Sequence, residues 1–130
     1  MREGFMIRDG SPDNTNTAMS VVPCVLVVDD DQMNIEVMKA MLDQENITFD
    51  IAFRGSMALS CIEQRIDEIN QGRTKVMYKV IFLDYSMPDM DGPKVATEIR
   101  KMVSKRLRAD YRQSPYICCC TAYTDASYKR

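Results

Sequence analysis

Three short apolar runs in the sequence are each followed directly by a polar side chain. The runs are residues 24–28, 80–83 and 116–120. The polar residues that follow them are Asp29, Asp30 and Asp31 after the first run, Asp84 after the second, and Thr121 after the third. In open α/β sheets, ligands bind beyond the carboxyl ends of the strands. We therefore expect these side chains to converge on one edge if the three runs are neighbouring parallel strands.

This group of residues favours phosphoryl chemistry with a metal ion. Carboxylates that lie close together repel one another, so they take up protons or bind a cation. Oxygen ligands suit hard cations, and Mg²⁺ is typically held by one or two carboxylates, waters and a phosphate oxygen. A carboxylate can also accept a phosphoryl group, and a metal offsets the charge of that group. We predict a Mg²⁺ pocket of Asp29, Asp30 and Asp84, in which Asp84 is the acceptor and the Thr121 hydroxyl hydrogen-bonds a phosphoryl oxygen.

A simpler interpretation is that the acids only cap helices or end strands. It suits Asp31, because Asp is favourable near a helix start. It does not explain acids at the ends of two buried strands, so we keep it for Asp31 alone.

Composition narrows the possible functions. The 130 residues fit one domain, and 45% hydrophobic with 28% charged residues is typical of a globular chain. A net charge of −2 shows no excess of basic residues of the kind that proteins use to bind nucleic acid. The chain has no His, which excludes a His-based triad, a His general base and a His metal site.

Strand and helix patterns alternate along the chain. The apolar runs and an alternating segment near residues 48–53 predict four strands. Helical patterns are expected near residues 33–44, after Gly55 and after Pro93, and the first should bury a stripe of Ile35, Met38, Met41 and Leu42. The order β-α-β-α-β-α-β predicts an α/β fold: a parallel sheet with helices on both faces and right-handed crossovers.

The ends and the cysteines suggest where the domain lies. Residues 1–22 are polar and are interpreted as a flexible leader or linker, with the domain at 23–130. No signal peptide or membrane span is evident, so we expect a cytoplasmic domain, or the cytoplasmic part of a larger protein. Five Cys with three in a row and no CxxC pair indicate reduced, core-packed thiols.

Three sequence blocks resemble the receiver domain of two-component response regulators in order and spacing. They are VLVVDD at 25–30, LDYSMPDMDG at 83–92, and Thr121-Ala122. The resemblance covers about residues 23–130, and the loops near Asn70 and Ala109 are similar to those in eukaryotic hybrid histidine kinases.

The resemblance implies a flavodoxin-like fold and a signalling role. A histidine kinase or histidine phosphotransfer protein would donate the phosphoryl group from a phosphohistidine to Asp84. Asp29 and Asp30 would hold Mg²⁺, with Asp30 the more direct ligand, and the backbone carbonyl of Ser86 would complete the metal site. Thr121 would be the switch hydroxyl. Such a domain is a phosphoacceptor that assists its own phosphorylation and dephosphorylation, rather than an enzyme.

The chain departs from the family in one respect. Receiver domains have a fifth strand that ends in a Lys, whereas this sequence stops at Arg130 and Lys129 comes too early to match. We therefore expect a sheet truncated before the fifth strand. This leaves an alternative open: a pseudo-receiver that acts only as a protein-interaction module.

Two other motifs suggest rival functions. Asp89, Asp91, Gly92 and Glu98 resemble part of an EF-hand loop, but its first ligand would be Met87 and a strand precedes it. A haloacid dehalogenase also uses an Asp after a strand, but it needs a second acid where Ser86 stands.

Overall fold

The computed structural model describes residues 21–107 and 114–120. Thr121, Lys129 and nearly all of the predicted leader, residues 1–22, lie outside these ranges. The elements are β1 (Val25–Val28), α1 (Gln32–Gln44), β2 (Phe49–Ala52), α2 (Gly55–Asn70), β3 (Val80–Asp84), α3 (Gly92–Arg106) and β4 (Tyr116–Cys120). The predicted alternation of strands and helices is confirmed.

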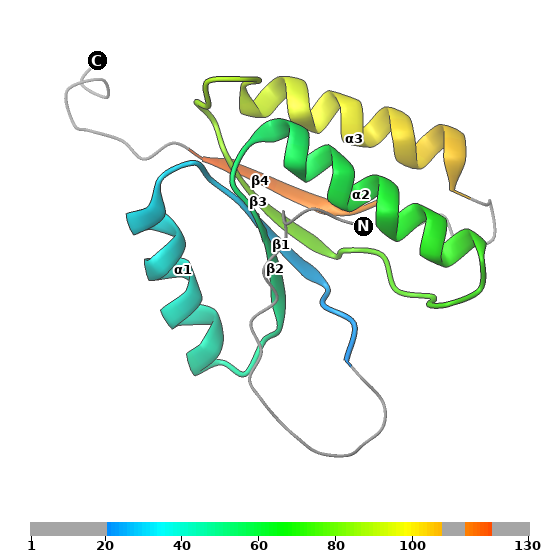
Figure 1. The fold of residues 1–130 in the computed structure, drawn as a ribbon, viewed down its shortest axis with the longest axis horizontal. Coiled ribbons are helices and arrows are strands. Elements are labelled where there is room, and N and C mark those ends of the chain that lie inside the picture. The colour runs from blue at the N-terminus through cyan, green and yellow to red at the C-terminus, as the bar shows by residue number, and fades with distance from the viewer. Residues whose placement is uncertain (1–20, 108–113, 121–130) are drawn as a thin grey trace.

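The four strands form one parallel sheet in the order β2-β1-β3-β4. Figure 1 shows α1 on one face of the sheet and α2 with α3 on the other. β3 therefore lies between β1 and β4, as the convergence of the polar strand ends requires. The register pairs Val28 with Leu83 and Leu83 with Cys119, so β1, β3 and β4 end at nearly the same level.

The core has two layers because the sheet is covered on both faces. All four residues of β1 are buried, as expected of a central strand in a parallel sheet. The layer toward α1 contains Val27 and Ile35, and the layer toward α2 and α3 contains Leu26 and Ile62. This packing fixes the ends of β1 and β3, on which the acids stand.

Two expectations about side chains were wrong. Met41 is 55% exposed, because it lies about 120° around α1 from the buried Ile35. Cys118 and Cys119 are exposed free thiols rather than core residues, because β4 is the edge strand of the described sheet. Cys61 is buried, as predicted. Within the described ranges, no helix is long and apolar enough to cross a membrane.

A buried ionic network lies at the amino ends of the strands, opposite the acidic edge. Asp50 of β2 is 1% exposed and accepts a hydrogen bond of 2.6 Å from the Tyr78 hydroxyl. The Arg65 guanidinium lies 3.4 Å from the same carboxylate and 4.0 Å from the centre of the Tyr78 ring. Arg65 also donates to the carbonyl of Pro23 at 2.8 Å. The network thus joins α2 to β2 and to the start of β1.

We expect the substitution Arg65→Met to destabilise the fold strongly, because it leaves the Asp50 carboxylate buried without its cation. Breaking a buried pair costs about 3–5 kcal/mol. The matched control is Arg106→Met, which removes the exposed pairs with Glu63 and Asp67 and should cost about 0–1 kcal/mol. Urea unfolding of both variants measures the difference. Equal losses would contradict a structural role for the buried network.

Candidate functional site

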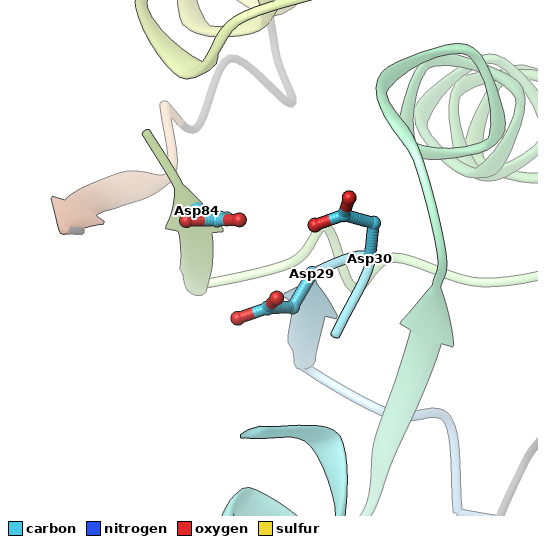
Figure 2. Close-up of side chains that lie close together, drawn as sticks. All are labelled: Asp29, Asp30 and Asp84. Atoms are coloured by element: carbon cyan, nitrogen blue, oxygen red, sulfur yellow. The ribbon is translucent and has the colours of Figure 1, made fainter. Parts of the chain in front are cut away.

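Asp29, Asp30 and Asp84 meet at the carboxyl edge of the sheet. One oxygen of each carboxylate lies within 4.8 Å of those of the other two. In Figure 2, Asp84 projects from the end of β3 toward Asp29 and Asp30, which follow β1. The two strands pair directly, so residues 55 positions apart in sequence come together. The convergence expected of these three acids is therefore observed.

Burial differs among the three acids and leaves the cluster open on one side. Asp84 is 9% exposed, Asp29 is half-buried and Asp30 is exposed. A small ion or group can therefore approach from the side of Asp30. The acceptor candidate, Asp84, lies deepest in the cluster.

Neighbouring donors orient Asp29. Its Oδ1 accepts a hydrogen bond of 2.9 Å from the backbone N–H of Asp31, and its Oδ2 accepts one of 3.2 Å from the Asn34 side chain. Asn34 lies in the first turn of α1 and was not predicted from the sequence. Asp31 caps α1 by accepting from the N–H of Met33 at 2.9 Å, as predicted. Local hydrogen bonds thus orient the Asp29 carboxylate, while the Asp31 carboxylate caps α1 and is not part of the acidic cluster.

Burial and neighbouring charge raise the pKa of Asp84. Its removal from water is the larger cause and the charge of Asp29 the next, and together they raise the pKa of Asp84 to about 6. The backbone N–H of Ser86 donates to the Asp84 carboxylate and lowers the pKa in part. The pKa of Asp29 is also raised, chiefly by burial. The cluster therefore holds more negative charge at neutral pH than its surroundings stabilise.

The described residues supply no cation to this cluster. Among residues 21–107 and 114–120, no Lys or Arg forms an ion pair with Asp29, Asp30 or Asp84. The buried Asp50, by contrast, has Arg65 beside it. Three carboxylates without a counter-charge, all offering oxygen, form the donor set that a hard divalent cation prefers.

The loop between β3 and α3 packs tightly against the site. The N–H of Gly92 donates to the carbonyl of Tyr85 at 2.7 Å and closes the loop. A Cβ at position 92 would lie 2.6 Å from the carbonyl oxygen of Asp84 and 2.6 Å from Sγ of Cys119. Only Gly fits there, because any side chain would displace the backbone of Asp84.

The acids of the EF-hand-like segment serve separate partners. Asp91 caps α3 by accepting from the N–H of Lys94 at 3.0 Å. Asp89 accepts from the amides of Gly55 and Ser56 at the start of α2. Glu98 lies 3.6 Å from the Lys101 ammonium. Each of the three carboxylates has its own partner, and the one acidic metal-binding group found among the described residues, Asp29 with Asp30 and Asp84, contains none of them, so the geometry does not support a calcium loop here.

Comparison with known proteins agrees with the geometry. Residues 25–130 match the response regulator receiver domain family. Hybrid signal transduction histidine kinase L of Dictyostelium discoideum is 38% identical over 81 residues, which are 62% of this chain and 4% of that kinase. Peroxide stress-activated histidine kinase mak1 of Schizosaccharomyces pombe is 31% identical over 93 residues, 72% of this chain and 5% of that kinase. The chain thus spans a small part of these relatives.

Solved structures show the same arrangement of strands and helices. The receiver domain of the histidine kinase CKI1 from Arabidopsis thaliana, complexed with Mg²⁺, has a TM-score of 0.67 at 27% identity, covering 78% of this chain and 69% of that one. The same domain with Mg²⁺ and BeF3⁻ has a TM-score of 0.63 at 29% identity, covering 77% and 66%. The family match begins at the first residue of β1 and includes both strands that carry the acids. The chain therefore belongs to the response regulator receiver domain family, whose members are signalling modules of two-component systems.

Proposed function

We propose that this chain is a phosphoacceptor in a phosphorelay. Asp84 takes a phosphoryl group from a phosphohistidine on a histidine kinase or a histidine phosphotransfer protein. One observation carries the proposal: three carboxylates meet at the carboxyl edge of the sheet, and the described residues provide no cation for them. Kinship with hybrid-kinase receiver domains supports the choice of phosphodonor.

The donor set fits Mg²⁺. Asp29, Asp30 and Asp84 would hold the ion, together with the backbone carbonyl of Ser86. Bound there, Mg²⁺ supplies positive charge that offsets both the carboxylates and the phosphoryl oxygens. Asp29 keeps its orientation through Asp31 and Asn34, while exposed Asp30 leaves an approach for the ion. The Mg²⁺ complex of the related Arabidopsis thaliana domain supports this assignment.

The Asp84 carboxylate acts as the nucleophile. One of its oxygens attacks phosphorus as the bond from phosphorus to the imidazole nitrogen breaks, and that nitrogen keeps the electron pair. The product is an aspartyl phosphate. Since only the ionised carboxylate attacks, the proton that burial favours on Asp84 must be absent in the reacting state.

Thr121 is proposed as the switch hydroxyl. It follows Cys120, the last described residue of β4, whose Cα pairs with that of Asp84. The new phosphoryl group adds about −1.5 to −2 charge at this edge, and the Thr121 hydroxyl would donate to one of its oxygens. We further propose that the domain works in the cytoplasm, where free thiols such as Cys118 and Cys119 stay reduced.

Phosphorylation of Asp84 is directly testable. We expect incubation with acetyl phosphate and Mg²⁺ to add one phosphoryl group to the chain, as measured by intact mass. Asp84→Asn should abolish the gain, while Asp43→Asn, at an exposed position on α1, should keep it. A gain that survives in Asp84→Asn would refute the assignment of the acceptor. No gain in the wild type would favour the interaction module instead.

Mg²⁺ should stabilise the fold by binding the acids. At ten times its dissociation constant, an ion that binds only the folded state adds about 1.4 kcal/mol to the free energy of unfolding. We expect this gain in urea unfolding of the wild type and little of it in Asp30→Ala. NaCl at matched ionic strength is the control, because salt alone also screens repulsion. An equal gain with NaCl would argue against a specific site.

Without metal, Asp84 should destabilise the fold at neutral pH. The ordinary pKa of its carboxyl is 3.8, and folding raises that pKa to about 6, so the folded state binds the proton more tightly. Stability therefore falls as pH rises from about 4 through about 6. In EDTA, Asp84→Asn should raise the free energy of unfolding at pH 7.5 by about 1–2 kcal/mol, since water on the open side reduces both the cost of burying the charge and the repulsion.

The same difference should be nearly lost at about pH 3.5, where Asp84 is mostly protonated in both states. Urea unfolding at the two pH values measures the difference, and Asp43→Asn, at an exposed position of α1, serves as the control for removing one charge. If Asp84→Asn were no more stable than the wild type at pH 7.5, burial and the neighbouring carboxylates would not penalise the charge of Asp84 as the raised pKa indicates.

A further inference from the structure

The start of α2 is capped from a distant loop. The first N–H groups of a helix lack partners within the helix, and the local N-cap residue Arg54 provides no side-chain hydrogen bond. Instead, Oδ1 of Asp89 accepts from the N–H of Gly55 at 3.1 Å, and Oδ2 accepts from the N–H of Ser56 at 3.0 Å. Both carboxylate oxygens of Asp89, a residue of the β3–α3 loop, thus accept hydrogen bonds from the start of α2.

Packing brings the same two segments into direct contact. A Cβ at Gly55 would lie 2.9 Å from Cβ of Met90 and 2.9 Å from Cγ2 of Val95. Gly therefore permits an approach that no other residue allows without movement. Met87 is 8% exposed and belongs to the core layer beneath α2 and α3, and Met90 is partly buried against that layer. The loop therefore packs closely against α2 in addition to forming hydrogen bonds with it.

The charge of Asp89 suits this contact. Burial raises the pKa of Asp89, but the amides of Ser56 and Gly55 outweigh it and hold the pKa below its usual value. The carboxylate is therefore ionised at neutral pH, and it faces the positive end of the α2 dipole. Two charge-assisted hydrogen bonds are among the stronger contacts available to an exposed loop.

This loop also carries backbone groups of the acidic site. It leaves β3 at Asp84, and the N–H of Ser86 donates to the Asp84 carboxylate. Gly92 closes the loop on Tyr85 at one end. The contact of Asp89 with α2 provides a second, independent attachment, 5 residues beyond Asp84.

We propose that Asp89 is a positioning residue for the acidic site. By fixing the β3–α3 loop to α2, its carboxylate holds the backbone of Ser86 against Asp84, where the carbonyl of Ser86 can bind the metal. This inference rests on the proposed function for its effect on Mg²⁺. The effect on the loop itself needs no metal. Outer partners that orient metal ligands typically change metal affinity about 10- to 100-fold when removed.

The test compares three variants with the wild type. Asp89→Ala removes both acceptors, and Asp89→Asn keeps one carbonyl oxygen. Asp67→Ala is the control, because it removes a carboxylate contact of α2 with α3 (Arg106 to Asp67, 3.1 Å) away from the loop. Calorimetric titration with Mg²⁺ should show about tenfold weaker binding in Asp89→Ala, an intermediate loss in Asp89→Asn, and no change in Asp67→Ala.

Hydrogen exchange of the metal-free proteins gives a second readout. Segment 85–91 should exchange faster in Asp89→Ala than in the wild type or in Asp67→Ala. If Asp89 only capped α2, Asp89→Ala would lower the free energy of unfolding and leave both loop exchange and Mg²⁺ affinity unchanged, which would overturn the inference. A wild type that binds no Mg²⁺ would refute the proposed metal site, while loop exchange would still decide whether Asp89 holds the loop. Should Asp89→Ala fail to fold, the same readouts on Asp89→Asn decide.

Discussion

Mutual repulsion among three carboxylates is the constraint on which this site depends. Asp29 and Asp30 follow β1, and Asp84 ends β3, so the pairing of these strands forces the acids together. The strands cannot move apart to relieve the repulsion, because both are packed between helix layers. What remains is a proton or a cation. The pKa of Asp84, raised first by burial and next by the charge of Asp29, favours the proton, and the proposed Mg²⁺ site would supply the cation.

Acidic side chains at the two ends of the sheet differ in whether the described residues supply them with a counter-charge. At the amino ends, Asp50 is compensated within the chain by Arg65 and by the Tyr78 hydroxyl, so its charge stabilises a packed junction. At the carboxyl ends, the described residues leave the acids without a cation. A compensated acid has no need of a ligand, whereas an uncompensated cluster at an open edge does. The contrast within one sheet is a stronger argument for ligand binding than the cluster alone.

Much of the site could be predicted from the sequence, because it depends on where apolar runs stop. The ends of β1 and β3 mark the acids, and strict strand–helix alternation predicts a parallel sheet. The alternation alone does not give the strand order, so the meeting of Asp29 with Asp84 remained conditional until β3 was found beside β1. The position of a residue around the helix axis also determines whether it is buried. Met41 follows the apolar pattern of α1 but faces solvent.

Residues whose partners lie far away in sequence were not predicted. Asp50 alternates with apolar neighbours and so resembles a solvent-facing strand residue, but Arg65, 15 positions later, allows it to be buried. Asp89 lies in a recognisable motif, yet its two acceptors serve amides 34 and 33 positions earlier. Both contacts depend on α2, whose placement over the sheet follows from tertiary packing rather than from any local pattern.

The position of α2 divides the surroundings of the acids into a fixed side and an open side. On the fixed side, Gly55 and Asp89 bring α2 against the β3–α3 loop, and Gly92 brings the start of α3 against the backbone of Asp84. On the open side, Asp30 is exposed. In the proposed function, an incoming phosphoryl group would meet tightly packed backbone behind Asp84 and open space in front of it. Preorganisation of this kind lowers the reorganisation needed when charge builds up in a transition state, so under the proposed function the tight Gly contacts would have a chemical consequence beyond packing.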